Sequence, residues 1–285
     1  MLKEVLKADL LRRWPLSEVW RLRLQSGETI IAKRGIDSMA SEGEVYQILL
    51  NRLNLTRPQV YDSYTEAHCS ILLMEDLGTV NLEKDPGREN YASAAKMLAE
   101  IRLSSQKQIS SGRLNASELH KFVQPEDRVF NDLQKILVSL DLNKEDTRIL
   151  QEAMTRLPDE LNRLYREYPM ALTHNDYNAK NIMVQQNKII PVDWSNASLS
   201  PHLGDLYCLI QEAERNEIER SFIVNAFQER FYTDMLDWQI QIGGVCWLIR
   251  GLCWVCEVGI TKVPGTENWV APLVEGIHRC MIQKG

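Results

Sequence analysis

The hydrophobic pattern of the chain changes near Gly78, and this change restricts the fold to two unequal parts. Before it, apolar and basic residues alternate over 19–24 and an apolar run resumes at 30–33 after a polar turn, which predicts a β-hairpin. Apolar residues at helical spacing over 41–53 predict a helix, and the run 70–75 predicts a buried strand. The first part is therefore expected to form a small sheet with one helix.

After Gly78 the pattern is mainly helical. Apolar residues recur with a period of 3.6 in three stretches, and further helical runs follow Gly204 to the end of the chain. The three stretches are 91–103, 126–138 and 145–168. One short strand pair, 181–184 with 189–192, interrupts them. We therefore predict an α+β fold with a small N-terminal antiparallel sheet, one helix beside it, and a larger, mainly helical C-terminal lobe.

The charge of the chain disfavours some classes of partner. Its 285 residues include 33 basic and 39 acidic side chains, which gives a formal net charge of −6. A nucleic-acid partner is not expected, because a phosphate backbone requires a basic surface. The acidic balance instead favours a cationic small molecule.

Neither the N-terminal segment nor the most apolar stretch of the chain predicts a membrane segment. Glu4 and Asp9 interrupt what would have to be the apolar run of a secretory signal. The most apolar stretch, 242–260, carries Arg250 and Glu257 near its centre, so a buried core helix is a better interpretation than a membrane span. Six scattered cysteines fit reduced thiols. We expect a cytoplasmic protein, and the oligomeric state stays open.

The densest polar cluster lies between two apolar strands of the C-terminal part. Asp176 and Asn181 bracket a short loop that leads into the first strand of the predicted hairpin, and Asp193 follows the second strand. A hairpin returns to its starting point, so these two carboxylates and one amide are expected to converge. Hard oxygen ligands of this kind suit Mg²⁺ bound together with phosphates. A free carboxylate beside them can accept a proton from a hydroxyl group.

This order of residues resembles a known family. The segment reads His174-x-Asp176-x-x-x-x-Asn181, a short hairpin, and then Asp193-Trp. It is similar to the catalytic segment of the aminoglycoside phosphotransferase and choline kinase-like family, whose members are small-molecule kinases with a protein-kinase-like fold. The resemblance extends from about Val19 to Leu209 with order and spacing preserved.

The resemblance implies roles for the polar residues. Asp176 matches the catalytic base that orients and deprotonates the acceptor hydroxyl, and Asn181 and Asp193 match the two metal ligands. Lys33 matches the lysine that holds the α- and β-phosphates, and Glu42 is expected to be its carboxylate partner. We choose Glu42 over Glu44 because it fits the family's Glu-x-x-Val-Tyr-x-x-Leu pattern.

Further positions are implied to support the nucleotide and the catalytic loop. Glu75 and Leu77 lie in a segment that resembles the hinge presenting backbone groups to the adenine. Asp205 resembles the acid that braces the catalytic loop, and His174 is expected to support this loop by a hydrogen bond. Between the family's first two strands this chain has 14–18 (Trp-Pro-Leu-Ser-Glu) without a glycine, where Ser17 is the candidate donor to a phosphate.

Taken together, the chain is expected to be a phosphotransferase that uses ATP or GTP with Mg²⁺. Residues 1–76 would form the nucleotide-binding lobe and residues 77–285 the catalytic and acceptor-binding lobe of one catalytic unit. The acceptor would be a hydroxyl group of an aminoglycoside, a choline-like amino alcohol, an amino acid or a sugar. The missing glycine turn leaves an alternative open, namely a catalytically weak or inactive binding or scaffold protein with a kinase fold.

Three weaker features have ordinary structural interpretations. Cys253 and Cys256 form a single CxxC pair on an apolar helix, where packing is a better interpretation than metal or redox chemistry. Interleaved acids favour a solvated helix face over a substrate-binding patch; they are Glu212, Glu214, Glu217 and Glu219. Four tryptophans are candidates for an aromatic wall facing a cationic acceptor, although most buried tryptophans only pack; they are Trp194, Trp247, Trp254 and Trp269.

Overall fold

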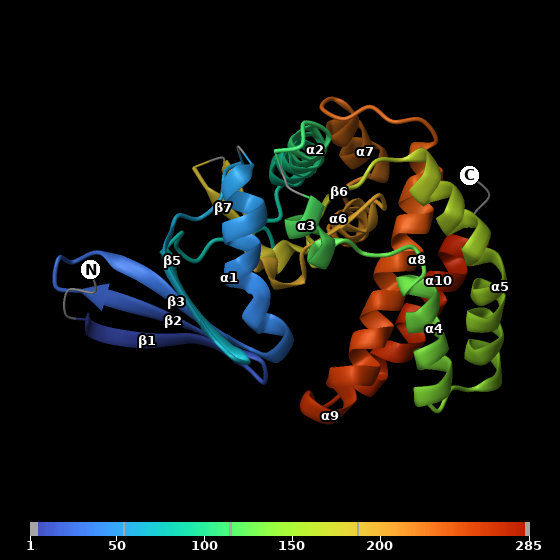
Figure 1. Ribbon diagram of the computed structural model, residues 1–285, viewed down its shortest axis with the longest axis horizontal. Coiled ribbons are helices and arrows are strands. Elements are labelled where there is room, and N and C mark those ends of the chain that lie inside the picture. Colours follow the sequence, from blue (N-terminus) through green and yellow to red (C-terminus); the bar gives the residue numbers. More distant parts are fainter. Residues whose placement is uncertain (1–4, 54, 114–115, 187, 283–285) are drawn as a thin grey trace.

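A five-stranded antiparallel sheet forms the N-terminal lobe of the computed structural model (Figure 1), which describes residues 5–53, 55–113, 116–186 and 188–282. The strands follow the order β1-β2-β3-β5-β4. They are β1 (Val5–Trp14), β2 (Ser17–Leu24), β3 (Thr29–Ile36), β4 (Val60–Glu66) and β5 (Cys69–Glu75). The predicted hairpin is β2–β3, in which Lys33 pairs with Val19.

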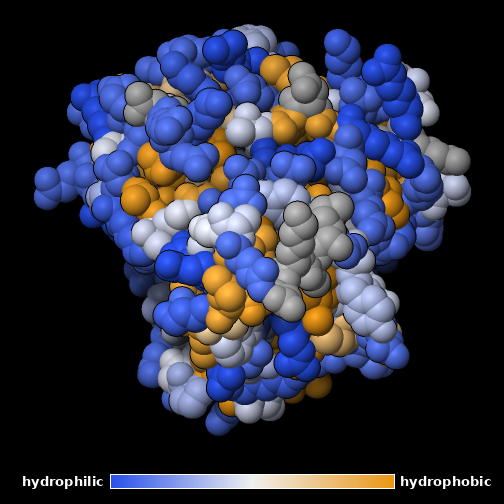
Figure 2. All heavy atoms as spheres, turned by 90° about the vertical axis from the view of Figure 1, so that its left-hand side faces the viewer, coloured by the Kyte–Doolittle hydropathy of each residue, from blue (hydrophilic) through white to orange (hydrophobic). Residues whose placement is uncertain are grey.

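Strands β1 and β4 were not predicted as members of the sheet. Both are edge strands, and most of their side chains are exposed to solvent. Edge strands lack the clean alternation of buried and exposed residues that identifies a strand from sequence. Strand β1 exposes Leu6, Leu10 and Leu11. On the face of the molecule that includes this lobe, hydrophobic side chains form separate patches between hydrophilic ones (Figure 2).

The predicted helix of the N-terminal lobe lies against the sheet. It begins as α1 (Glu42–Glu44), continues through a wider π-helical turn at Val45–Leu49, and ends in the 3₁₀ turn Leu50–Arg52. Its apolar side chains at the predicted spacing are buried. This packing places the first residue of the helix, Glu42, in the interior behind the sheet.

The C-terminal lobe is built mainly from helices (Figure 1). The longer ones are α2 (Arg88–Ser110), α4 (Arg128–Ser139), α5 (Lys144–Glu167), α6 (Gly204–Arg215), α7 (Arg220–Gln228), α8 (Leu236–Trp254) and α10 (Val270–Ile282). The short ones are α3 (Ala116–Leu119) and α9 (Ile260–Lys262). Each of the three predicted helical stretches corresponds to one helix, namely α2, α4 and α5.

Two small strand pairs lie between α5 and α6. Strand β6 (Ala171–Thr173) pairs with β9 (Ser198–Ser200), and β7 (Ile182–Gln185) pairs with β8 (Lys188–Pro191). The second pair is the predicted hairpin. Strand β7 of this hairpin also contacts the beginning of the C-terminal lobe. There, Leu82 donates its backbone N–H to the Ile182 carbonyl at 2.8 Å.

Helix α8 is the core helix of the C-terminal lobe. The helical segment Leu236–Lys262 has the length and composition to cross a membrane, but 61% of its most apolar window is buried inside the protein. Helices α4, α6 and α10 pack around α8 (Figure 1). Neighbouring helices therefore cover much of its apolar surface, which fits a core helix.

Candidate active site

The loop after strand β6 carries the predicted catalytic segment, and a buried acid holds it. Asp205, in the first turn of α6, accepts the backbone N–H groups of His174 at 2.7 Å and of Asn175 at 2.8 Å. Asn175 has a left-handed backbone, with φ of 61°. An asparagine tolerates this conformation better than most residues do. The two hydrogen bonds hold the turn that presents the next residue, Asp176, to the cavity described below.

The ring of His174 connects this loop to the second strand pair. Its Nε2 lies 3.0 Å from the Val192 carbonyl oxygen, and its Nδ1 lies 3.3 Å from the backbone N–H of Asp176. This pattern requires a neutral ring that donates from Nε2 and accepts at Nδ1. Burial lowers the pKa of His174 to about 4, which keeps the ring neutral. The geometry fits the loop-supporting role expected from the sequence.

The neutral His174 ring makes the stability of the protein sensitive to acid. A pKa lowered from 6.5 to about 4 means that the unfolded chain takes up a proton first as the pH falls, so stability is lost between these values. We expect His174→Gln to destabilise the protein less at pH 5 than at pH 7, by about 2 kcal/mol. Urea unfolding of both proteins without nucleotide or Mg²⁺ measures this difference. An equal effect at both pH values would show that His174 does not titrate in this way.

Asp176 is held by two amide side chains of the same loop. Asn178 donates its Nδ2 to one carboxylate oxygen at 2.5 Å, and Asn181 donates its Nδ2 to the other at 2.8 Å. Burial raises the pKa of Asp176, and the nearby Lys180 opposes this shift. A fixed carboxylate with a raised pKa is well suited to accept a proton from a bound hydroxyl.

The β7–β8 hairpin brings the two predicted metal ligands to the same region. Asn181 precedes β7, and its carbonyl accepts the backbone N–H of Val192 at 2.9 Å. Asp193 is the next residue along the chain and has a left-handed backbone, with φ of 67°. Aspartate, like asparagine, tolerates this conformation better than most residues do.

Lys33 lies between two buried carboxylates. Its Nζ is 2.5 Å from Glu42 Oε2 and 2.6 Å from Asp193 Oδ1. Burial lowers the pKa of Lys33, but the two carboxylates outweigh it and raise the pKa above its usual value. Burial likewise raises the pKa of Asp193, but Lys33 and Arg12 outweigh it and hold this pKa well below its usual range. The other candidate acid, Glu44, is paired with Lys121 on the surface instead.

Strand β1 adds a residue that the sequence did not indicate. Arg12 reaches Asp193 Oδ2 with its Nη2 at 3.1 Å, so both oxygens of this carboxylate have a cationic partner. Ser17, after the β1–β2 turn, is buried and lines the same cavity as Arg12. Strand β1 was itself not predicted, and therefore Arg12 had no predicted position from which to contact the site.

The predicted hinge residues lie where the two lobes join. Strand β5 ends at Glu75, whose carboxylate accepts the Gln59 backbone N–H at 3.1 Å, and Leu77 is buried. Between them Asp76 binds Arg21 through two hydrogen bonds of 2.6 and 2.8 Å. Glu75 and Leu77 are not among the residues that line the cavity beside Asp176. Arg21 also donates to the Gly78 carbonyl at 3.2 Å, so strand β2 is hydrogen-bonded to the segment that connects the two lobes.

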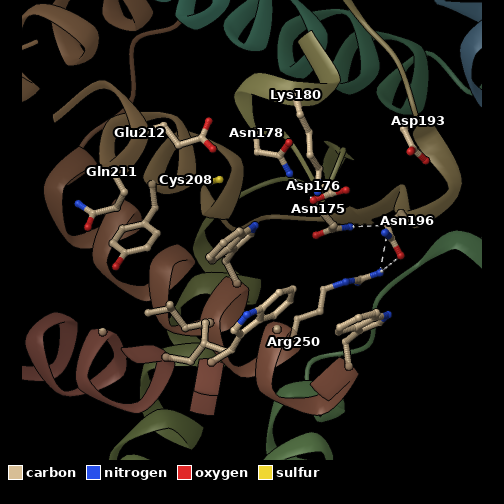
Figure 3. Close-up of a pocket in the computed structure, with 18 of the residues that line it drawn as sticks. Asn175, Asp176, Asn178, Lys180, Asp193, Asn196, Cys208, Gln211, Glu212 and Arg250 are labelled. Carbon is tan, nitrogen blue, oxygen red and sulfur yellow. Dashed lines mark hydrogen bonds between the residues drawn. The ribbon is translucent and has the colours of Figure 1, made fainter. Parts of the chain in front are cut away.

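A cavity of about 510 Å³ opens beside Asp176. The catalytic loop, the β1–β2 turn and helices α6, α8 and α10 contribute to its wall (Figure 3). Three of the predicted site residues line it directly, namely Asp176, Asp193 and Ser17. Lys33 and Asn181 do not line it, but each hydrogen-bonds to a carboxylate that does. The volume is typical of sites for small organic ligands.

The aromatic wall differs from the predicted one by one tryptophan. Trp247, Trp254 and Trp269 line the cavity, and the rings of the last two stack with centroids 6.0 Å apart. Trp194 is instead buried beneath the catalytic loop, where its ring lies 4.4 Å from that of His174. Trp14 completes the wall from the N-terminal lobe, with its ring 6.0 Å from Trp254.

The remaining candidates divide between packing and the site. Burial raises the pKa of Cys253 to about 12 and of Cys256 to about 11, so both thiols stay neutral. In the described part of the chain, no three histidine, cysteine or acidic side chains gather into a metal site. Glu214, Glu217 and Glu219 are exposed, as a solvated face requires. Glu212 is the exception, because it lines the cavity and accepts the Ala179 N–H at 2.5 Å.

The sequence matches the phosphotransferase enzyme family over residues 11–241. Among curated proteins, none matches this chain.

Solved structures share the fold. Aminoglycoside phosphotransferase APH(2'')-Ib with ADP bound is 15% identical, with 98% of this chain and 96% of that chain covered and a TM-score of 0.66. The gentamicin complex of APH(2'')-IIa is also 15% identical, with 98% and 92% covered and a TM-score of 0.65. A thermostable mutant of APH(4)-Ia with ADP and hygromycin B is 13% identical, with 99% and 96% covered and a TM-score of 0.63.

Proposed function

The chain belongs to the phosphotransferase enzyme family, and on that premise we propose that it transfers the γ-phosphate of ATP to a hydroxyl group of a small molecule, with Mg²⁺ as cofactor. The observation that carries this proposal is the position of Asp176. Its carboxylate is fixed by Asn178 and Asn181 and faces a cavity of about 510 Å³, which is large enough for a small acceptor.

In this proposal Asp176 acts as the base of an in-line transfer. The acceptor oxygen forms a bond to the γ-phosphorus while the bond from that phosphorus to the β-γ bridging oxygen breaks, and ADP leaves with the electron pair. The hydroxyl proton moves to a carboxylate oxygen of Asp176. The raised pKa of this carboxylate favours the transfer, because a base with a higher pKa holds the proton more firmly.

The proposed nucleotide site lies beside this cavity, around Lys33, which is paired with the cavity-lining Asp193. Lys33 is a fixed cation supported by Glu42, which suits it to hold the α- and β-phosphates. Glu75 and Leu77 lie at the connection between the lobes, where their backbone groups are candidates for binding the base. ADP is bound in two of the similar structures, which supports an adenine nucleotide as the donor.

Asn181 and Asp193 have the donor chemistry that Mg²⁺ requires. Mg²⁺ is commonly held by one or two protein oxygens together with substrate phosphates and water. Asp193 offers a carboxylate whose pKa is held low, so it stays ionised, and Arg12 places a positive group against its Oδ2. The Oδ2 atom of Asp193 therefore lies in surroundings where it binds a positively charged group. When bound, Mg²⁺ would neutralise the charge of the phosphates.

An assay of nucleotide binding and turnover tests this function. We expect calorimetry to detect ATP-Mg²⁺ binding, and coupled ADP release to rise above the basal rate with at least one compound of a panel of hydroxylated amino alcohols, amino acids, aminoglycosides and sugars. Omitting Mg²⁺ serves as the matched control. Absence of ATP binding at millimolar nucleotide would instead favour the alternative of a scaffold protein with a kinase fold.

A further inference from the structure

The helical wall of the cavity has a charge opposite to that of the whole protein. Helices α6, α8 and α10 contribute three arginines to the lining, Arg215, Arg250 and Arg279, but one acid, Glu212. The carboxylate of Glu212 already accepts a backbone N–H from the catalytic loop. The chain as a whole carries a net charge of −6. The helical part of the wall is therefore positively charged, in contrast to the chain as a whole.

Among the described residues, Arg215 and Arg250 are the arginines of this wall without an ion pair, and of the two Arg250 is the one that is partly buried. It lies on the apolar core helix α8 and is only partly accessible to solvent. Across the described residues, its hydrogen bonds go from Nη2 to Asn196, to the carbonyl at 3.2 Å and to Oδ1 at 3.4 Å, and no carboxylate lies within 4.0 Å. By comparison, Arg279 in the same wall is paired with Glu275 at 2.9 Å.

The position of Arg250 relates it to the acceptor side of the cavity. Figure 3 shows its side chain extending toward Asn196, on the same side of the pocket as Asn175 and Asp176. Asn175 donates to the same Asn196 carbonyl at 2.9 Å. One residue thus connects the guanidinium to the loop that carries the proposed base. A ligand that places a hydroxyl at Asp176 can reach Arg250 with another of its groups.

A guanidinium in partly buried surroundings favours an anionic partner. Taking a charge out of water is costly unless a charged or strongly hydrogen-bonding group compensates it. Burial and the neighbouring Arg128 lower the pKa of Arg250, and the more distant carboxylates Asp132, Asp205 and Asp176 oppose this shift without reversing it. The planar fork of arginine matches the two oxygens of a carboxylate. A cationic ligand would add repulsion at this point.

The rest of the wall suits an apolar body. Trp247, Trp254 and Trp269 line the cavity, and Trp14 closes it from the N-terminal lobe. Indole faces can also bind cations, but Arg250 and Arg215 lie in the same wall and disfavour a cation there. An aromatic or aliphatic body gains from burial against the indoles without that repulsion.

We propose that the acceptor is a hydroxylated organic acid with an apolar or aromatic body, and that Arg250 binds its carboxylate while Asp176 receives its hydroxyl. This inference rests on the proposed function and names the substrate class of the same site. It replaces the cationic acceptor that the net charge favoured. Arg250 acts here as a specificity-determining residue, since it contacts a part of the acceptor that does not react.

The test compares acids with neutral molecules of the same shape. The panel consists of 3-phenyllactate, tropate and 4-(hydroxymethyl)benzoate, the corresponding amides, and kanamycin and choline as cationic acceptors. ADP release with ATP-Mg²⁺ gives kcat and KM, and calorimetry gives binding. We expect the wild-type protein to prefer at least one acid over its amide by tenfold or more in kcat/KM.

Variants of the wall separate the proposed role from a structural one. Arg250→Gln keeps a hydrogen-bonding group near Asn196 but removes the charge, so it should raise KM for the preferred acid about 10- to 100-fold and change the amide less than twofold. Arg250→Lys should restore part of the loss. Arg279→Gln is the matched control, because Arg279 lines the same cavity but is paired with Glu275. It should change KM less than twofold.

Several results would overturn the inference. An equal fall of kcat for acids and amides in Arg250→Gln would mean that Arg250 acts on the loop or on the phosphate. Acids that are neither bound nor phosphorylated at millimolar concentration would also contradict it, as would a preference for kanamycin or choline. In each case ATP binding and turnover of another acceptor would leave the proposed function intact. Absence of ATP binding would remove both.

Discussion

Replacing Asp176 by asparagine is expected to lower kcat by about 10²- to 10⁴-fold while ATP affinity stays within about twofold. Asparagine preserves the size of the side chain but cannot accept the hydroxyl proton. In the proposed function, nucleotide binding depends on Lys33 and its carboxylate partners. Among the described residues, none of these side chains hydrogen-bonds to Asp176, whose carboxylate is held by Asn178 and Asn181. Steady-state ADP release and calorimetry with ATP-Mg²⁺ measure the two quantities separately.

The control for Asp176 is another acid of the same cavity. Glu83 lines the cavity but is exposed to solvent, and Glu83→Gln removes a carboxylate without touching the hydrogen bonds of the catalytic loop. We expect Glu83→Gln to keep kcat within about twofold. Wild-type activity in Asp176→Asn would show that another group accepts the proton and that the proposed mechanism is wrong.

Replacing Lys33 by methionine is expected to weaken ATP binding strongly and to destabilise the fold by about 3–5 kcal/mol. The side chain is only 7% exposed and lies within 2.6 Å of two carboxylate oxygens, so the variant leaves the buried Glu42 without a cation and leaves Asp193 with Arg12 alone. Urea unfolding gives the free energy of unfolding, and calorimetry gives the nucleotide affinity.

A second substitution separates the two effects of Lys33. In Lys33→Met with Glu42→Gln, the carboxylate left without a cation is replaced by a neutral amide, so stability should recover in part while ATP affinity stays low. Lys180→Met is the matched control, because it removes the charge of a lysine that lines the cavity but is exposed to solvent. An unchanged free energy of unfolding in Lys33→Met would mean that the two carboxylates take up protons instead of staying charged.

Local patterns in the sequence predicted much of the fold. Helices α2, α4 and α5 each bury one face against a neighbour, and the β2–β3 and β7–β8 hairpins consist of apolar segments joined by polar turns, so both kinds of element leave a local pattern. Strands β1 and β4 escaped prediction, since exposed edge strands carry little periodicity. Because β1 was not predicted, Arg12 and Trp14 were not identified as residues of the site, although both line the cavity. In the sequence, Arg250 stands out only as a charge within the apolar stretch 242–260, and nothing there indicated that it lines a cavity.

The sequence by itself determined the order and spacing of Asp176, Asn181 and Asp193. The physical reason is local: a short loop and a tight hairpin leave few ways to place these side chains, so their proximity follows from chain connectivity.

Only the tertiary structure decided which residues line the cavity that we propose binds the acceptor. The cavity wall is assembled from β1, α6, α8 and α10, which are distant in sequence and meet through the packing of the two lobes. The net charge of the chain counts every acidic and basic side chain equally, whereas ligand binding depends on the few charges without an ion pair that line one cavity. Among the described residues that line this cavity, the partly buried guanidinium of Arg250 has no ion pair, and no spacing rule could have placed it beside the catalytic loop.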